Sequence, residues 1–315
     1  MPAVEFVCNL CPHGCGVRRS EQAGDGICAS KSTVRVARAA LHYWEEPCIS
    51  GTRGSGTVFF SGCPLHCVYC QNDSVSRKNY GADISLQRLG EIFRELESQG
   101  AHNINLVNPT HYAYAVRKVL EQSPPGIPVV YNSGGYDRIE TLRSLEGLVD
   151  IYLPDLKYVS PNLSARYSGA ADYFSAASAA VLEMARQTGP AVFDKDGLLL
   201  SGTIVRHLIL PNQVENSLEV LRWCKEHLPE GTLVSVMAQY TPCGRAAEFP
   251  ELNRRITKRE YERVLDALFE LGLTEGFVQE RSSAKEEYIP PFDLSGVLTE
   301  GGKNNGTEGI PGRKN

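Results

Sequence analysis

The chain has 315 residues, enough for one large domain with a full core and a small appendage. Its formal net charge of −5 predicts no broad basic surface, which argues against nucleic acid as a partner. With 42% hydrophobic residues, no apolar run of membrane-spanning length and neither a basic leader nor an apolar stretch at its start, it reads as a cytoplasmic globular protein without a membrane partner.

Residues 1–50 are rich in cysteine and turn residues and show few periodic apolar stretches. After them, short apolar strands alternate with longer amphipathic segments. The predicted strands are 57–61, 103–107, 128–132, 150–155, 203–210 and 232–237. The predicted helices are 85–99, 112–122, 138–144, 173–187, 215–227 and 258–271. Thr257 and Glu260 at the start of the last helix are spaced as in a capping box.

This alternation predicts βαβ units, a parallel sheet and the α/β fold class. Six units are compatible with a doubly wound sheet or with part of a barrel, and periodicity does not separate the two. In both folds the chemistry gathers at the carboxyl ends of the strands. We expect three parts: a Cys-rich metal-binding segment (1–50), an α/β body (51–290) and a flexible, Gly-rich tail (291–315) that is disordered.

The first predicted strand is followed directly by a loop with three cysteines. Cys63, Cys67 and Cys70 have the spacing C-x3-C-x2-C. Thiolates are the usual ligands of iron–sulfur clusters, and a 4Fe–4S cube ordinarily takes four. Three local cysteines leave one iron free to bind a small molecule. Zinc is the alternative, but it prefers four tetrahedral ligands, and no fourth cysteine follows at the spacing of a zinc knuckle.

Cys63-x-x-x-Cys67-x-Tyr69-Cys70 resembles the signature of the radical S-adenosylmethionine (SAM) superfamily. The flanking residues resemble those of an activating-enzyme-like branch that is related to pyruvate formate-lyase activating enzymes; they are Gly54-Ser55-Gly56-Thr57-Val58-Phe59-Phe60-Ser61-Gly62 and Gln71-Asn72. The resemblance covers about residues 1–290.

This resemblance implies a partial (β/α)6 TIM-like barrel. It also implies a 4Fe–4S cluster at Cys63, Cys67 and Cys70 whose open iron binds SAM. One electron, supplied by a donor such as flavodoxin or ferredoxin, would cleave SAM to methionine and a 5′-deoxyadenosyl radical. That radical would abstract hydrogen from a substrate. The cofactors would supply the difficult chemistry, and the protein would orient them and exclude water.

The resemblance also indicates residues for SAM. Activating enzymes have Gly-Gly-Glu after the second strand, where this chain has Asn108-Pro109-Thr110-His111, so Asn108 and Thr110 are expected to replace that carboxylate. Three further expected contacts match family elements at the ends of later strands: Asp155, Lys157 and Arg206. Tyr69 is expected near the adenine. Because adjacent strand residues face opposite sides, His207 should then pack away from the cavity.

A second cysteine group precedes the body. Cys8, Cys11, Cys15 and Cys28 supply four thiols in a Gly-rich segment. Four ligands would close a coordination shell, so we expect a structural or electron-relay site that holds zinc or a second iron–sulfur cluster. The other three cysteines, Cys48, Cys224 and Cys243, are interpreted as small buried residues. Disulfides are not expected in a cytosolic chain of this length.

Three functions remain open at this stage. The first is a radical SAM enzyme that takes hydrogen from a glycine of a partner protein, and the second is one that acts on a small molecule or another protein residue. The third is a non-enzymatic iron–sulfur electron carrier or zinc-binding module. An electron carrier needs no α/β body of this size, which disfavours the third. Substrate contacts lie in variable loops, so the substrate is not identified.

Overall fold

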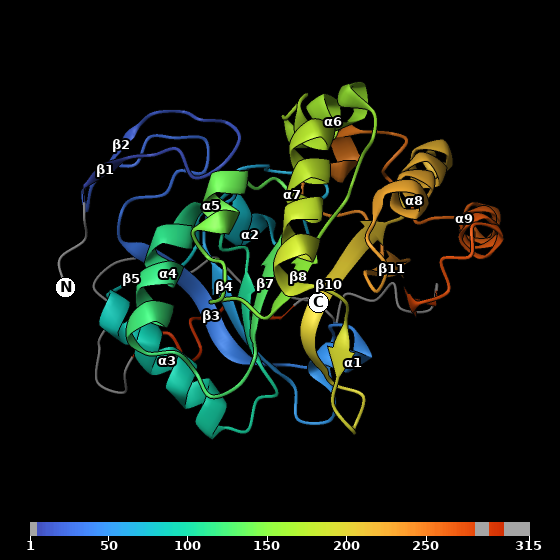
Figure 1. The fold of residues 1–315 in the computed structure, drawn as a ribbon. Coiled ribbons are helices and arrows are strands. Elements are labelled where there is room, and N and C mark those ends of the chain that lie inside the picture. Colours follow the sequence, from blue (N-terminus) through green and yellow to red (C-terminus); the bar gives the residue numbers. More distant parts are fainter. Residues whose placement is uncertain (1–4, 281–289, 299–315) are drawn as a thin grey trace, which may run out of the picture.

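Six parallel strands occupy the positions expected from the sequence. In the computed structural model, which describes residues 5–280 and 290–298, they are β4 (Ser55–Phe60), β6 (Ile104–Val107), β7 (Val129–Ser133), β8 (Ile151–Pro154), β10 (Leu199–Leu208) and β11 (Leu233–Met237). They lie side by side in that order with parallel pairing throughout. The expected α/β class with a parallel sheet is confirmed (Figure 1).

Helices connect these strands at the expected places. They are α3 (Leu86–Ser98), η1 (Thr110–Tyr112) with α4 (Ala113–Gln122), α5 (Ile139–Arg143), α7 (Tyr173–Thr188), α8 (Val214–His227) and α9 (Lys258–Glu270). The capping box of α9 is present, since the Thr257 side chain accepts from the Glu260 amide and the Glu260 side chain accepts from the Thr257 amide. Among the described residues, four short helices were not expected: α1 (Pro47–Ser50), α2 (Asp73–Ser76), α6 (Pro161–Ser168) and η2 (Ala246–Glu248).

The sheet extends beyond the six expected strands. β12 (Gly276–Val278) adds a further parallel strand beside β11, and β9 (Val192–Phe193) pairs with β10. At the other edge, β3 (Val34–His42) runs antiparallel to β4 and to β5 (Ala82–Ile84). β3 lies inside the segment 1–50, where few apolar stretches were expected, yet Val34 and Val36 are core residues. The sheet therefore begins within that segment; the division into three parts otherwise stays a prediction.

Part of the expected tail packs against this edge. The Leu294 amide donates to the Ala37 carbonyl at 3.1 Å, and the Ala39 amide donates to the Ser295 carbonyl at 2.8 Å. Val297 is fully buried in the core formed by β3, α3 and α4. The expectation of a tail that is flexible from residue 291 is thus wrong for residues 291–298. The remaining tail residues, 299–315, lie outside the described part of the chain.

The two faces of the sheet differ. One face packs against helices, with the apolar sides of α3 and α4 against β4, β6 and β7. On the other face, α1 (Pro47–Ser50) places Cys48 and Ile49 against apolar residues in the amino-terminal half of the strands. Nearer the carboxyl ends of the strands, this same face carries polar side chains, among them Asn132 and Arg206. This one-sided arrangement agrees with the expected partial barrel. No helix in the described ranges is long and apolar enough to span a membrane.

Candidate active site

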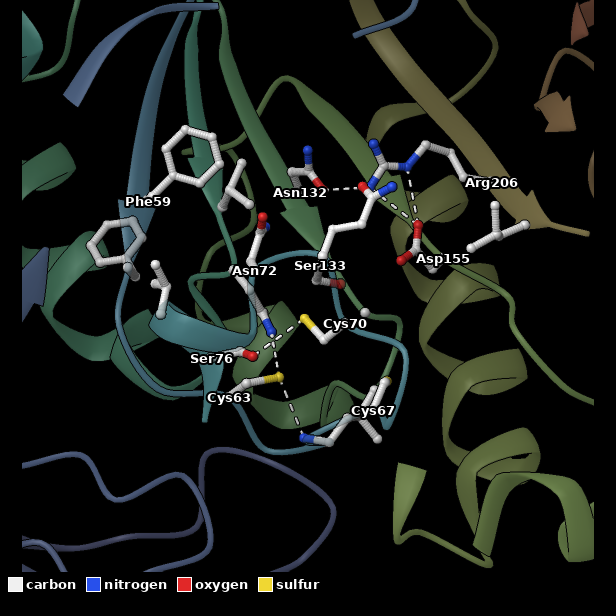
Figure 2. Close-up of a pocket in the computed structure, with 18 of the residues that line it drawn as sticks. Phe59, Cys63, Cys67, Cys70, Asn72, Ser76, Asn132, Ser133, Asp155 and Arg206 are labelled. Atoms are coloured by element: carbon white, nitrogen blue, oxygen red, sulfur yellow. Dashed lines mark hydrogen bonds and ion pairs between the residues drawn. The ribbon is translucent and has the colours of Figure 1, made fainter. Parts of the chain in front are cut away.

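A cavity of about 260 Å³ opens at the carboxyl ends of the parallel strands. It brings together eight residues expected to bind the cluster or SAM: Cys63, Cys67, Tyr69, Cys70, Asn108, Asp155, Lys157 and Arg206. Figure 2 shows the sulfurs of Cys63 and Cys70 and the charged ends of Asp155 and Arg206 directed toward the same space. Residues that are more than 130 positions apart in the sequence thus form one site.

The three central cysteines lie in the Cys loop (residues 61–72), which follows β4. Ser168 donates a hydrogen bond to the Cys67 sulfur at 3.0 Å, and Ser76 donates one to the Cys70 sulfur at 3.2 Å. Burial, reinforced by the neighbouring sulfurs, raises the pKa of Cys63 to about 12 and that of Cys70 to about 11. Metal ligation would overcome this, because a bound cation deprotonates a coordinating thiol.

The chemistry of these donors fits an iron–sulfur cluster. Among the described residues, no three His, Cys, Asp or Glu side chains converge closely enough to hold a single metal ion. A 4Fe–4S cube does not need that convergence, because each thiolate ligates a different iron. Three thiols on one cavity wall, two of them already accepting hydrogen bonds from serine hydroxyls, fit a cube with one iron left open to the cavity.

A charged wall lies opposite the cysteines. Asp155, which follows β8, forms ion pairs with Lys157 and, at 3.1 Å, with Arg206 of β10. Burial opposes ionisation of Asp155, but the two cations outweigh it and hold the pKa of the carboxyl below its usual range. Burial likewise opposes the charge of Lys157, and the Asp155 carboxylate outweighs it and raises the lysine pKa. All three groups therefore stay charged near neutral pH.

Glu45 is a cavity residue that the sequence did not indicate. It lies between β3 and α1, and its carboxylate pairs with Arg206 at 3.0 Å. The side-chain amides of Asn105 and Asn132 each donate to it at 3.2 Å. Arg206 thus bridges two carboxylates. Glu45 is 161 positions from Arg206 in the chain, and no local motif marks it.

Asn108 and Thr110 are placed differently from each other. Asn108 lines the cavity, and its side-chain amide donates to the Cys63 sulfur at 3.4 Å. Thr110 is buried outside the lining, with its hydroxyl 2.8 Å from the Asn108 side-chain oxygen and 2.7 Å from Asp137 Oδ1. The buried Asp137 carboxylate also accepts from Ser133 at 2.5 Å. Thr110 is therefore linked to the cavity through two lining residues, directly through Asn108 and, by way of Asp137, through Ser133.

The remaining neighbours are arranged as follows. Tyr69 lines the cavity, and its hydroxyl is 2.5 Å from the hydroxyl of Tyr158. His207 is buried on the other side of β10, where Nδ1 lies 2.8 Å from the Leu156 carbonyl and Nε2 lies 2.8 Å from the Ser217 hydroxyl. The expectation that Arg206 faces the cavity and His207 packs away from it is confirmed.

The N-terminal cysteines (Cys8, Cys11, Cys15 and Cys28) lie close together. Burial raises the pKa of Cys11 to about 12, and the sulfurs of the other three add to this shift. Three of the four are buried, and Cys15 is exposed. The structure gives all ten cysteines as free thiols. Cys48 and Cys224 are buried small residues, as expected, whereas Cys243, which was also expected to be buried, is only partly buried. The metal expected at the N-terminal cysteines stays a prediction.

Comparison with known proteins identifies the family. The chain is 30% identical over 271 residues to the uncharacterized protein MJ0674 of Methanocaldococcus jannaschii, a match that covers 82% of this chain and 73% of that protein.

Two solved structures are similar in fold. One is Streptococcus suis SuiB bound to the precursor peptide SuiA, with a TM-score of 0.48, 13% identity, and coverage of 69% of this chain and 46% of SuiB. The other is methylornithine synthase (PylB), with a TM-score of 0.48, 16% identity and 70% coverage of both chains. Neither likeness bears on activity or substrate. The model of the radical SAM superfamily matches residues 57–238, more than half of the chain, and this protein therefore belongs to the radical SAM superfamily.

Proposed function

We propose that this protein cleaves SAM reductively at a 4Fe–4S cluster held by Cys63, Cys67 and Cys70, and abstracts hydrogen from a substrate. Family membership implies the cluster and SAM. The observation that carries the proposal is the shared cavity, because the three sulfurs and the charged wall line the same space. When bound, the cluster would supply the electron that cleaves SAM, and a small redox protein such as flavodoxin or ferredoxin would reduce it.

The charged wall suits the methionyl end of SAM, which carries both an amino group and a carboxylate. Asp155 and Glu45 offer carboxylates to the amino group, and Lys157 and Arg206 offer cations to the carboxylate. Asn108, supported from behind by Thr110, would take the place of the family carboxylate after the second strand. Tyr69 would stand by the adenine. In this proposal these residues orient SAM at the open iron.

Apolar side chains make up much of the rest of the lining. Phe59, Leu208 and Met237 line the cavity, together with the half-exposed Trp44. An apolar wall would exclude water from a radical that must meet only its substrate. The substrate is either a glycine of a partner protein, as in the activating-enzyme-like branch, or a small molecule. The residues that flank the three cysteines are the observation that bears on this choice. We infer the activating-enzyme-like branch from those residues.

Anaerobic reconstitution with iron and sulfide tests the proposal. The reduced protein should convert SAM to methionine and 5′-deoxyadenosine, quantified by mass spectrometry. Cys67→Ala should abolish this product. Cys243→Ala is the matched control, because the Cys243 sulfur is near the same loop but donates to the Tyr69 carbonyl at 3.0 Å and is not one of the expected ligands. Equal deoxyadenosine from Cys67→Ala and wild type would contradict the proposal.

We infer in addition that the N-terminal cysteines bind a second metal, zinc or an iron–sulfur cluster. Four thiols are the donor number of either centre. Among the described residues no three such side chains converge closely enough for a single ion, so zinc would require the four thiols to move together, whereas a cube, in which each thiolate ligates a different iron, would not. The Gly14 amide donates to the Cys11 carbonyl at 3.0 Å, a tight turn of the kind that wraps a metal. A protein with Cys63, Cys67 and Cys70 all replaced by Ala should still contain metal in elemental analysis.

A further inference from the structure

Arg19 of β2 (Arg18–Arg19) is a fully buried cation. Within the described residues its guanidinium bonds two backbone carbonyls, those of Lys31 and His111, and no carboxylate. Three aromatic rings lie within 6 Å of the guanidinium carbon: Phe6, Tyr112 and Tyr114. Aromatic faces and carbonyls solvate a cation but do not neutralise it, and an uncompensated charge in the interior is strongly unfavourable.

The remaining contact of Arg19 is with sulfur. Its Nη1 points at the Cys8 sulfur at 3.8 Å. A neutral thiol is a weak acceptor, whereas a thiolate is an anion that an arginine N–H binds strongly. Four thiolates around a divalent metal, or around an oxidised 4Fe–4S cube, form a net anion. A metal centre at the N-terminal cysteines would therefore supply the negative charge that the surroundings of Arg19 lack.

The segment that carries the N-terminal cysteines packs against the Cys loop. The Cys28 carbonyl lies so close to Gly62 that a Cβ at residue 62 would come within 2.6 Å of it. His13 Nε2 lies 2.8 Å from the carbonyl of Pro64, the residue after Cys63. From the other side, His111 Nε2 lies 2.7 Å from the Ser61 carbonyl, while the His111 carbonyl accepts from Arg19. Both flanks of Cys63 are thus fixed by the N-terminal segment or by a residue bound to Arg19.

We propose that Arg19 is the buried counter-ion of a tetrathiolate metal centre at the N-terminal cysteines, and that this centre holds the Cys loop in position for the first cluster. The inference rests on the second metal proposed above and assigns that metal a structural, positioning role. It predicts one effect that a merely space-filling Arg19 would not produce and a second effect that tests the positioning role of the centre.

The first effect is that the substitution of Arg19 weakens the protein when metal is bound and does not weaken it when metal is absent. Arg19→Met keeps the side-chain length and removes the charge, and Arg18→Met is the matched control, because Arg18 is exposed and pairs with Glu5 at the surface. In a background with Cys63, Cys67 and Cys70 replaced by Ala, Arg19→Met should release the remaining metal to a chelator about tenfold faster or more. In metal-stripped protein the same substitution should raise the melting temperature or leave it unchanged, because it removes an unpaired buried charge. Arg18→Met should show neither effect.

Several results would overturn the inference. If the protein with Cys63, Cys67 and Cys70 replaced by Ala contains no metal, the inference has no basis. If Arg19→Met and Arg18→Met release metal at equal rates, Arg19 is not the counter-ion. Should Arg19→Met fail to fold with metal, Arg19→Lys must restore metal retention, since it restores the charge; continued loss would contradict the role of charge. Elemental analysis separates the two centres that fit, because zinc has no visible absorption and an iron–sulfur cluster does.

The second effect concerns the Cys loop. Cys15 is exposed, so Cys15→Ser disturbs no packing, and it should lower N-terminal metal content. With the central cysteines intact, this loss should change the EPR spectrum of the reduced first cluster or its iron occupancy. An unchanged spectrum and occupancy after loss of the N-terminal metal would overturn the positioning role. Failure of SAM cleavage with the N-terminal metal in place would instead contradict the proposed function.

Discussion

Replacing Arg206 by Ala tests the charged wall most directly. The Arg206 side chain is 11% exposed and pairs with Asp155 at 3.1 Å and with Glu45 at 3.0 Å. After its removal Asp155 keeps Lys157 as a partner, whereas the partners that Glu45 keeps among the described residues are the neutral side-chain amides of Asn105 and Asn132. The variant therefore loses a cation offered to the SAM carboxylate and leaves a buried carboxylate without its counter-ion.

Both losses have a calculable size. Truncating one member of a buried, hydrogen-bonded charge pair typically costs about 2–5 kcal/mol of binding free energy, which is ~30-fold or more in the SAM dissociation constant. The free energy of unfolding should fall by about 3–5 kcal/mol, because breaking a buried ion pair leaves an uncompensated charge. The iron content should stay unchanged, because Arg206 makes its side-chain hydrogen bonds with Asp155, Glu45 and Asn132 and not with the three cysteines.

His207→Ala is the matched control from the same strand. His207 makes its two polar contacts on the far side of β10, with the Leu156 carbonyl and the Ser217 hydroxyl. Its loss should lower the free energy of unfolding by about 2–3 kcal/mol through a cavity and unpaired polar groups. The SAM dissociation constant should change by no more than about twofold, which is under 0.5 kcal/mol.

The assay is a SAM titration followed by the EPR spectrum of the reduced cluster, with iron content and urea unfolding measured on the same preparations. Weakened SAM binding in Arg206→Ala and retained binding in His207→Ala would support the assignment of the wall. Wild-type affinity in Arg206→Ala would refute the reasoning, because an arginine that bridges two carboxylates at the cavity would then contribute nothing to the ligand.

Three further predictions concern stability, each measured by urea unfolding of the protein. Burial lowers the pKa of His207 from 6.5 to about 4, so between these pH values the unfolded chain binds a proton that the folded protein does not. The free energy of unfolding should therefore fall by about 2 kcal/mol from pH 7 to pH 5 because of this group. An equal pH dependence of stability in His207→Gln would contradict this. Gly135 has φ +79°, and a Cβ there would lie 2.1 Å from the Asp155 carbonyl oxygen, so Gly135→Ala should lower the free energy of unfolding by about 2–4 kcal/mol. Gly147 has φ +77° but open space around it, so Gly147→Ala should lower it by about 1 kcal/mol. Similar losses in the two variants would rule out the clash. Thr257→Ala should cost about 1 kcal/mol by removing the cap of α9, and no loss would show that the capping box is not stabilising.

Short-range patterns were sufficient for much of the protein. The six parallel strands follow from apolar runs between amphipathic segments, and α9 begins at its capping box. The spacing of Cys63, Cys67 and Cys70 indicated the superfamily, because in this chain the three expected ligands of one cluster lie within one loop. The alternation of a strand predicted that Arg206 and His207 face opposite sides, and the family resemblance indicated that Arg206 is the one that faces the cavity. Each of these depends on neighbours a few positions apart.

What the tertiary structure decided depends on contacts between distant parts of the chain. Glu45 joins the cavity because α1 closes the amino-terminal half of the sheet face and Glu45, two residues before that helix, lies beside Arg206. β3 joins the sheet because β4 and β5 pair with its two edges. Residues 290–298 pack against β3, against Phe59 of β4 and against Arg88 of α3. Arg19 reads as an ordinary surface arginine until the fold buries it beside Cys8 and His111. Burial and charge compensation are properties of the assembled chain, so no local pattern of residues reveals them.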